Sequence, residues 1–390
     1  MTEIKSMGYL TKKIDKVDWE CIDADTQYLT HGIHRYSGKF IPQIARNAIE
    51  VTTKKNDLVL DLYVGSGTTL LEASMLQRKS IGVDLSPLAI LISKVKTTPI
   101  KKDKLHKWFI GFVDLIQDYE AGGNLSFFDN IQRKIDKKDV ENDPRLNDAW
   151  YTKWFQKNIL RELIWIDLNI NQIADKKIQS LAILTLSDIL RKSSNAHGSY
   201  PNVMFDKNKK NVSSAIPKYV RRLKEIVASV GELDSVVKKD YIPKIFECNN
   251  KCLSLEANSI DAIITHPPYI GSIPYAEYGI LSLTWFGESA KMLDANLTGG
   301  QRQRKNVVER FNDDYAAMFK EAYRTLKRGK YMFILIGNPT VRGEKIDLAG
   351  TSVRCALEAK FKLDTKISRK GVNRRANLMG EESILFFRKG

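Results

Sequence analysis

The sequence has few of the features that mark membrane, secreted or metal-binding proteins. No segment of its 390 residues approaches the roughly eighteen uninterrupted apolar residues of a membrane-spanning helix. The N-terminus has no apolar stretch of the kind found in signal peptides. Cysteines are scarce and none forms a Cys-x-x-Cys pair, so we predict reduced thiols and no zinc site at Cys21, Cys248, Cys252 and Cys355. These absences predict a cytoplasmic protein with no membrane partner and no metal.

Internal repeats and low-complexity tracts are absent too. A chain of 390 residues can bury a large core, so we expect one large domain or two. Positive charge, in contrast, is abundant, with 62 Lys and Arg against 46 Asp and Glu and a net charge of +16. This balance favours an anionic partner such as nucleic acid. The surplus is uneven: residues 301–390 carry 21 basic against 10 acidic residues, and residues 191–224 carry nine basic residues and one acid.

The basic segment 191–224 is predicted to be a long polar loop, because it is rich in Ser, Asn, Gly and Pro. Long loops in compact proteins are usually functional or disordered. A plain solvated loop and a phosphate-binding loop both remain open from composition alone.

The stretch Thr265-His266-Pro267-Pro268-Tyr269 follows a short apolar run that is predicted to be a buried strand. Two prolines cannot continue a strand ladder, so the chain must stop there with rigid, outward-facing carbonyl groups beside an aromatic ring. A planar base with an exocyclic amino group fits such a place. The ring can stack on Tyr269, and the amino hydrogens can bond a proline carbonyl and residue 266. The simpler interpretation is a turn that ends a strand.

A second strand run, Asp57–Leu62, leads into a loop with Gly65 and Gly67 and then into a helix pattern. Glycines let the backbone turn sharply and approach a ligand, and amides at a helix start face anionic groups. About twenty residues on, another strand ends in Asp84, where a carboxylate can take ribose hydroxyls. Together these elements predict a cofactor that contains a nucleoside. A helix cap is the simpler role for Asp84, because Ser86 and a proline follow.

Strands are predicted to alternate with helices, which indicates an α/β fold with a doubly wound, mostly parallel sheet. The predicted strands lie near residues 58–62, 80–84, 260–264, 331–337, 361–368 and 383–388. The last two are close enough to pair as a hairpin. We expect residues 1–100 and 241–390 to form the sheet domain.

Residues 101–240 are predicted to form a largely helical insert. Apolar periodicity marks helices in 106–116, 150–170 and 178–190. Three aromatic residues of the insert are expected in its core rather than against a base, namely Trp154, Phe155 and Trp165.

The two motifs resemble those of one family. The run Asp61–Thr69 resembles the S-adenosylmethionine loop of DNA methyltransferases that act on exocyclic amino groups, and Thr265–Tyr269 resembles their catalytic motif. The run His34–Pro42 is similar to a segment that precedes the cofactor loop in many members. Leu62-Tyr63 stands where the family usually has Pro-Phe, and His266 stands where it has Asp, Asn or Ser. Histidine accepts a hydrogen bond only when neutral, through one nitrogen.

The resemblance implies a seven-stranded Rossmann-like methyltransferase sheet with an antiparallel edge hairpin. It also implies methyl transfer from S-adenosylmethionine to a base flipped out of double-stranded DNA. The stretch from Tyr275 to Gly287, with Trp154-Phe155 and Ile189–Ser194, resembles members assigned to cytosine N4, which is therefore favoured over adenine N6. An RNA base-amino methyltransferase and a catalytically inactive nucleic-acid-binding homologue also remain open. No Pro-Cys dipeptide occurs, which argues against cytosine C5 chemistry.

The resemblance also assigns roles to residues and partners. The expected catalytic residues are His266, Pro267, Pro268 and Tyr269. The expected cofactor-binding residues are Tyr36, Lys39, Phe40, Asp61, Tyr63, Gly65, Ser66, Gly67, Thr68 and Asp84, with Asn249 or Asn250 near the adenine. The helical insert is expected to recognise the DNA target. The uneven basic charge, taken together with a base-modifying site elsewhere in the chain, predicts phosphate contacts, which are expected from Arg191, Lys192, Lys207, Lys209, Lys210, Arg221, Arg222, Arg302 and Arg304. A cognate restriction endonuclease is a candidate partner.

Overall fold

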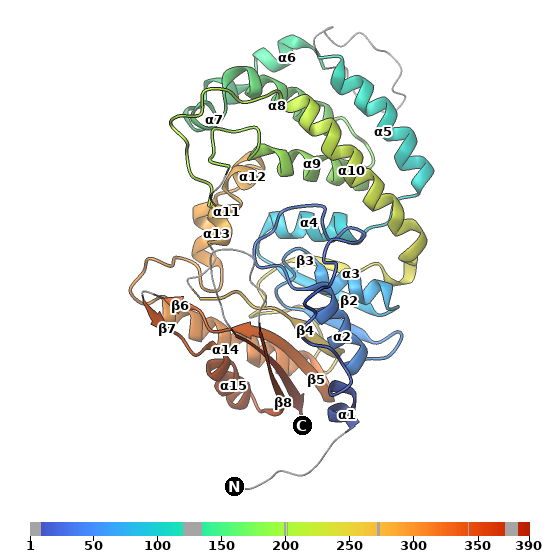
Figure 1. The fold of residues 1–390 in the computed structure, drawn as a ribbon, viewed down its shortest axis with the longest axis vertical. Coiled ribbons are helices and arrows are strands. Elements are labelled where there is room, and N and C mark those ends of the chain that lie inside the picture. Colours follow the sequence, from blue (N-terminus) through green and yellow to red (C-terminus); the bar gives the residue numbers. More distant parts are fainter. Residues whose placement is uncertain are drawn as a thin grey trace.

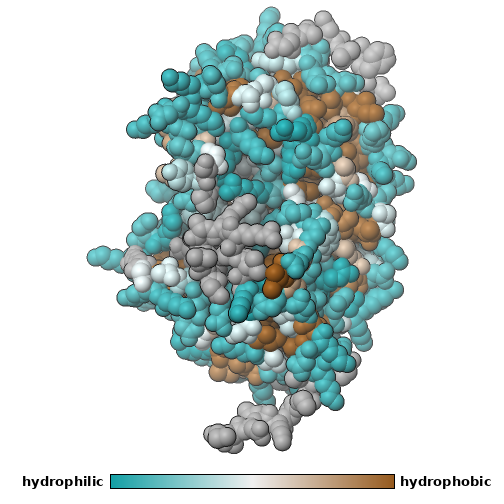
Figure 2. Space-filling model, in the orientation of Figure 1, coloured by the Kyte–Doolittle hydropathy of each residue, from teal (hydrophilic) through white to brown (hydrophobic). Residues whose placement is uncertain are grey.

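The computed structural model describes residues 9–119, 135–198, 200, 202–270, 274–341, 343–370 and 381–390. Figure 1 shows a twisted sheet with helices on both faces, and a separate layer of helices stacked above it. Hydrophilic side chains cover most of the visible face of both layers (Figure 2). None of the helices in the described ranges is long and apolar enough to cross a membrane.

The sheet has the strand order β3-β2-β1-β4-β5-β9-β8. The first five strands run parallel, β9 is antiparallel to β5, and β8 is antiparallel to β9. This confirms the predicted doubly wound sheet with an antiparallel edge. Its strands are β1 (Leu58–Asp61), β2 (Lys79–Asp84), β3 (Lys244–Glu247), β4 (Ile260–Thr265), β5 (Leu326–Gly337), β8 (Phe361–Arg369) and β9 (Glu382–Lys389). A separate two-stranded ribbon pairs β6 (Thr340–Val341) with β7 (Glu344–Lys345).

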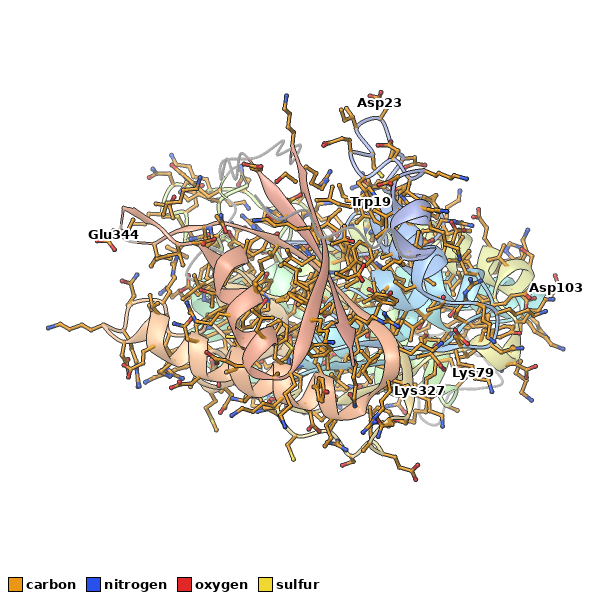
Figure 3. All side chains as sticks on the ribbon, turned by 90° about the horizontal axis from the view of Figure 1, so that it is seen from below. Trp19, Asp23, Lys79, Asp103, Lys327 and Glu344 are labelled. Carbon is orange, nitrogen blue, oxygen red and sulfur yellow. The ribbon has the colours of Figure 1, made fainter. Side chains whose placement is uncertain are left out.

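Neighbouring residues of each central strand face opposite sides of the sheet, so the sheet carries two cores. Val59 packs with the N-terminal helices on one face, and Leu60 packs with the C-terminal helices on the other. In the view from below, the blue N-terminal helices near Trp19 and the orange C-terminal helices lie on opposite sides of the strands (Figure 3). The helices of the sheet layer are α1 (Tyr9–Ile14), α2 (Pro42–Thr52), α3 (Thr68–Met75), α4 (Pro87–Thr97), α14 (Val307–Thr325) and α15 (Leu348–Glu358).

The helical layer has its own core, in which Phe155 and Trp165 are fully buried and Trp154 is nearly so, as predicted. Leu88, Ile92 and Val95 of α4 belong to the same core, so α4 joins the sheet to the helical layer. The helices of the layer are α5 (Lys102–Gln117), α6 (Lys137–Glu141), α7 (Ala149–Trp154), α8 (Lys157–Asn171), α9 (Lys176–Leu190) and α10 (Ala215–Val236). Short elements complete the chain: η1 (Pro144–Asn147), η2 (Lys239–Tyr241), α11 (Tyr275–Tyr278), α12 (Ile280–Trp285) and α13 (Ala290–Asn296).

The structure differs from the sequence-based expectation in three local features. Strand β3 was not predicted, because three of its four side chains are exposed and no apolar run marks it. The predicted helix 150–170 is interrupted, because Phe155 and Gln156 adopt extended backbone angles. The basic loop ends at Ser214 rather than at residue 224. There the distant carboxylate of Glu162 accepts hydrogen bonds from the amides of Ala215, at 2.5 Å, and Ile216, at 3.3 Å, and so caps the start of α10.

Gly82 of β2 offers a test of how tightly the sheet packs beneath the glycine loop. A Cβ atom there would lie 2.6 Å from Cγ2 of Val64 and 2.7 Å from Cδ1 of Leu70. Gly82→Ala should therefore lower the free energy of unfolding by about 1–3 kcal/mol, the usual cost of overpacking. Gly198→Ala, which meets no atom within 4 Å, is the matched control and should change it by less than about 0.5 kcal/mol. Urea unfolding curves measure both, and equal midpoints would contradict the packing argument.

Candidate active site

One pocket lies where the carboxyl ends of β1, β2 and β4 meet, as parallel strands require. The loop after β1, Asp84 at the end of β2, and His266 with Pro268 after β4 all line it. Of the predicted cofactor residues, all but Gly67 line this pocket, namely Tyr36, Lys39, Phe40, Asp61, Tyr63, Gly65, Ser66, Thr68 and Asp84. The structure thus brings the two sequence motifs to one space.

The glycine loop adopts backbone angles that only glycine takes readily. Gly65 has φ of 47° and Gly67 has φ of 76°, both in the left-handed region. A Cβ atom on Gly67 would lie 2.8 Å from Cβ of Ser93 on α4, and one on Gly65 would lie 3.1 Å from Cε1 of Tyr36. The loop is therefore held between α4 and Tyr36. Its end opens α3, whose first amides have no acceptor within the helix itself.

Asp84 ties two loops together. Its Oδ2 accepts a hydrogen bond from the amide of Gly65 at 3.0 Å, and its Oδ1 accepts one from the amide of Ser86 at 2.9 Å. The residue that caps α4 is Ser86, whose hydroxyl accepts from the amide of Ala89 at 3.4 Å. Burial raises the pKa of Asp84 above its ordinary value. Each carboxylate oxygen keeps a lone pair for a hydroxyl donor.

Asp61 links the end of β1 to the end of β4. Its Oδ1 accepts hydrogen bonds from the Thr265 hydroxyl at 2.7 Å and from the Tyr63 amide at 3.1 Å. Only 3% of Asp61 is exposed, and burial raises its pKa to about 6 even though hydrogen bonds oppose the shift. The carboxyl group therefore titrates close to neutral pH.

Two residues of the expected catalytic motif, His266 and Tyr269, are in contact with each other. Nε2 of His266 lies 2.7 Å from Oη of Tyr269, which also lies 3.5 Å from a carboxylate oxygen of Glu382 on β9. Burial lowers the pKa of His266 to about 4, and a hydrogen bond to the carbonyl of Gly38 opposes this shift. The imidazole is thus neutral above that pH, with its proton toward Gly38 and with Nε2 accepting from Tyr269. Only 5% of Tyr269 is exposed, and it does not line the pocket. The expected stacking on a base requires its side chain to move.

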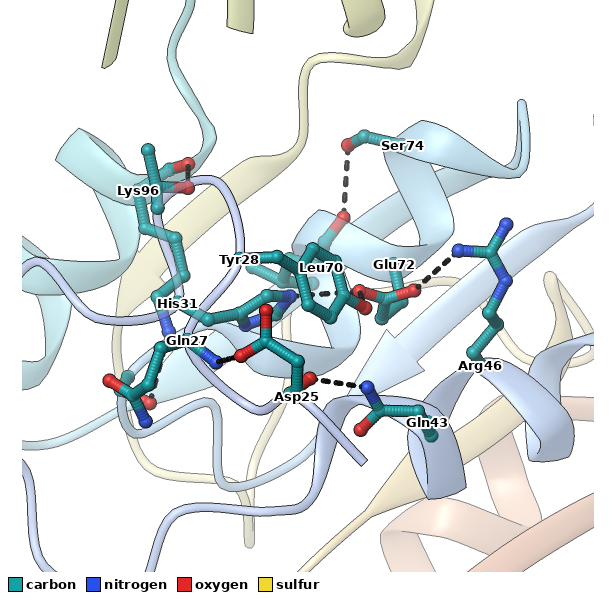
Figure 4. Close-up of polar contacts among 12 residues, drawn as sticks. Asp25, Gln27, Tyr28, His31, Gln43, Arg46, Leu70, Glu72, Ser74 and Lys96 are labelled. Carbon is teal, nitrogen blue, oxygen red and sulfur yellow. Dashed lines mark hydrogen bonds and ion pairs between the residues drawn. The ribbon is translucent and has the colours of Figure 1, made fainter. Parts of the chain in front are cut away.

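Beneath the glycine loop, Glu72 of α3 holds the N-terminal segment in place. Its fully buried carboxylate accepts hydrogen bonds from Oη of Tyr28 at 2.5 Å, from Nε2 of His31 at 2.8 Å and from Nη1 of Arg46 at 3.5 Å. Figure 4 shows Tyr28 and His31 on one side of this carboxylate and Arg46 on the other. This contact fixes the chain that leads to Tyr36 and Lys39 in the pocket wall.

A larger cleft lies between the sheet layer and the helical layer. Tyr36, Lys39 and Tyr275 line both this cleft and the first pocket, so the two spaces share a wall. The rings of Tyr36 and Tyr275 lie 6.2 Å apart. Four of the predicted DNA-binding residues also line the cleft, namely Arg191, Lys192, Lys209 and Arg222.

Three of these basic side chains make contacts that hold the protein together. Nε of Arg222 lies 2.7 Å from Asp188, and its Nη2 donates to the carbonyls of Gly32 and Ile33 at 3.0 and 2.8 Å. Arg191 donates to carbonyl groups of the loop at His197, Tyr200 and Asn202. Lys209 donates to those of Ser194 and Ala196, at 2.7 and 2.9 Å. These side chains therefore hold the loop in its folded conformation and also line the cleft.

The remaining predicted DNA contacts lie nearer the surface. The exposed side chains are Lys192, Lys207, Lys210, Arg221 and Arg304. Arg302 is half-buried and pairs with Glu277 at 3.1 Å. Exposed cations of this kind can approach phosphates from solvent.

Several pocket residues come from parts of the chain that no motif marked. The hydroxyl of Tyr63 donates to Oγ1 of Thr298 at 3.3 Å. Asn250 lines the pocket, Asn249 does not, and the Asn250 amide donates to the carbonyl of Leu62 at 2.9 Å. In the sequence, Tyr275 is marked only by the resemblance of its segment to methyltransferases assigned to cytosine N4. No local signal marks Thr298, because its contact spans 235 positions.

Comparison with known proteins gives consistent matches. A family model described as DNA methylase matches residues 11–95. The type II methyltransferase M.MjaII of Methanocaldococcus jannaschii is 24% identical over 67% of this chain, and the chain spans 64% of that relative's length. The type II methyltransferase M.MvaI of Kocuria varians is 23% identical over 82% of this chain and 79% of its own. A solved methyltransferase from Methanosarcina mazei, described as dependent on S-adenosylmethionine, is 10% identical over 87% of this chain and 95% of its own, with a TM-score of 0.36.

The family match covers the N-terminal segment, the glycine loop and Asp84, and the relatives align over much of the remaining chain. The motifs, their common pocket and the sequence matches agree. These sequence matches support a relationship to the DNA methylases that act on exocyclic amino groups, N6 of adenine or N4 of cytosine.

Proposed function

We propose that this protein transfers a methyl group from S-adenosylmethionine to the exocyclic amino group of a DNA base. The observation that carries the proposal is that His266 and Pro268 line the same pocket as Gly65, Ser66 and Asp84. A methyl acceptor and a nucleoside cofactor bound by these two groups would meet in one space. The match to a family model described as DNA methylase supports DNA as the substrate. We place the reaction in the cytoplasm, with a cognate restriction endonuclease as a candidate partner.

The residues of the pocket fit S-adenosylmethionine. Gly65 and Gly67 present backbone without side chains at positive φ, and two buried carboxyl groups suit a ligand with a positive charge and ribose hydroxyls. We assign Asp84 to the ribose, Asn250 to the adenine edge and Asp61 to the amino group of the methionyl end. The cofactor supplies a methyl group activated on a sulfonium.

On the acceptor side, Tyr269 leaves His266 and stacks on a flipped base, while the Pro267 carbonyl and Nε2 of His266 hold the amino hydrogens. These bonds draw the nitrogen lone pair out of conjugation with the ring and orient it. Catalysis then comes mainly from positioning. A neutral His266 is suited to this role, because an imidazolium has no free lone pair to accept a hydrogen bond.

Cytosine N4 is the favoured target, because the segment from Tyr275 to Gly287 resembles members assigned to that base. Nucleoside analysis of DNA from cells that express the protein should detect N4-methylcytosine. N6-methyladenine would redirect the proposal to adenine, methylated tRNA would redirect it to RNA, and no methylated nucleoside would favour an inactive homologue.

Tyr269 is the sharpest test of the acceptor site. Tyr269→Ala should reduce methyl transfer by about two orders of magnitude or more, because the base loses its stacking partner and its alignment. Binding of S-adenosylhomocysteine should change little, because Tyr269 does not line the cofactor pocket. Methyl transfer from labelled cofactor and calorimetric binding measure the two effects. Retained activity would remove Tyr269 from the mechanism.

The pKa of Asp61 predicts how cofactor binding depends on pH. A protonated carboxyl cannot pair with an ammonium group, so affinity for S-adenosylhomocysteine should weaken as the pH falls below about 6 and stay level above it. Asp61→Asn should bind more weakly at about pH 8 and lose this step. In the unliganded protein the sign is opposite, because a carboxyl pKa raised from 3.8 to about 6 lowers the free energy of unfolding as the pH rises between these two values. Calorimetry across about pH 5 to 8 measures the binding. A slope left in the variant would come from the other groups at the site with shifted pKa values, namely Asp84, Lys39 and Lys96.

The exposed basic loop predicts salt-dependent DNA binding. With six or more phosphate contacts, affinity should fall by about 10³ or more between roughly 50 and 200 mM salt. Replacing Lys207 and Lys210 together by Ala should reduce the slope of log affinity against log salt by about two. The same change at Lys362 and Lys366, on the distant edge strand β8, removes equal charge and should leave the slope unchanged. A flat salt response in fluorescence anisotropy would contradict the basic loop as a DNA contact.

A further inference from the structure

A buried lysine lies directly behind the glycine loop. Lys96, in the last turn of α4, is only 1% exposed, and its ammonium lies 3.3 Å from Oγ of Ser66. Ser66 lines the cofactor pocket, whereas Lys96 does not. Across the described residues, the Ser66 hydroxyl is the one hydrogen-bond partner of this ammonium, and no carboxylate forms an ion pair with it. A buried ammonium with three donors and one neutral partner is costly.

The charges around Lys96 do not balance. Glu72 is the nearby carboxylate, but it already accepts from Tyr28, His31 and Arg46. Burial lowers the pKa of His31 to about 4, so His31 adds no negative or positive charge near neutral pH. Lys39 adds a second cation, held by a bond from its Nζ to the His31 carbonyl at 2.8 Å.

Burial and Lys39 hold the pKa of Lys96 well below its ordinary value. Figure 4 shows Lys96 beside His31, on the side of the cluster away from Arg46. The Lys96 ammonium thus has no carboxylate partner of its own among the described residues, and a bound anion nearby would stabilise its charged form.

The anion can approach only from the pocket side. Because the Ser66 hydroxyl accepts from Lys96, its own proton is free to donate in another direction, into the pocket that Ser66 lines. Lys39 lines the same pocket, and the amides that open α3 begin two residues after Ser66. A carboxylate placed there would meet a hydroxyl proton, a helix N-terminus and the field of two lysines.

We propose that Lys96 is a positioning residue for the carboxylate of the bound cofactor: it orients the Ser66 hydroxyl and provides the positive charge behind it. The proposal rests on the function proposed above, because it takes the anion to be the methionyl carboxylate of S-adenosylmethionine. It also assigns the two ends of the cofactor to different parts of the pocket. The nucleoside binds at Asp84 and Asn250, and the amino-acid end is recognised through Lys96.

The test compares two ligands that differ in the amino-acid end. S-adenosylhomocysteine carries the carboxylate, and 5′-methylthioadenosine has the same nucleoside thioether without it. Lys96→Met should weaken binding of the first by about 10- to 100-fold, as for a lost charge-assisted hydrogen bond, and of the second by less than about two-fold. Lys94→Met, at an exposed position of the same helix, is the matched control and should change neither. Calorimetry measures all the affinities.

Ser66→Ala tests whether Lys96 acts through the hydroxyl. The double variant Lys96→Met with Ser66→Ala should lose no more affinity for S-adenosylhomocysteine than the more damaging single variant. The unliganded Lys96→Met protein should melt no lower than the wild type, because an unmatched buried charge is replaced by an apolar chain. If Lys96→Met fails to fold, Ser66→Ala alone must reproduce the difference between the ligands.

Three results would overturn the proposal: equal weakening for both ligands, no weakening for either, or fully additive losses in the double variant. Failure of the proposed cofactor gives a different pattern, in which the wild-type protein binds neither S-adenosylhomocysteine nor 5′-methylthioadenosine. Failure of the proposed DNA substrate alone leaves both affinities, and their response to Lys96→Met, in place.

Discussion

The site depends on the hydrogen bond that joins Asp61 to Thr265 at the ends of β1 and β4. These residues lie 204 positions apart, yet both are buried and their side chains lie 2.7 Å from each other. The bond sets the glycine loop and the Pro-Pro-Tyr turn against one pocket. Its donor is the residue directly before His266, so the motif that we assign to the base is held next to the loop that we assign to the cofactor.

Buried charge is the second constraint on this region. Asp61, Asp84, Glu72 and Lys96 lie around or beneath one short loop. Glu72 has its full set of partners, whereas the carboxyl groups of the pocket have raised pKa values and Lys96 has a lowered one. These buried ionisable groups are better stabilised in the presence of a zwitterionic ligand than in its absence. The electrostatics therefore favour a cofactor with both an ammonium and a carboxylate.

His266 distinguishes the proposed acceptor site from the family motif that it resembles. A carboxylate or amide at this position would stay available to an amino group, whereas the single acceptor nitrogen of His266 is engaged by Tyr269. In the proposed mechanism, one movement of Tyr269 would free that nitrogen and present the aromatic ring. Binding of the base would then be coupled to release of an internal hydrogen bond.

The sequence by itself determined the alternation of strands and helices, the glycine loop at Gly65 and Gly67, and the turn at Pro267-Pro268, because apolar runs, glycines and prolines act locally. It could not determine that Tyr269 is buried, that Arg222 is bound to Asp188, or that Glu162 starts α10 at residue 215. Those outcomes depend on partners 34 to 113 positions away, which no local pattern encodes. Only the tertiary structure decides which side chains remain available to a ligand and which hold the protein together.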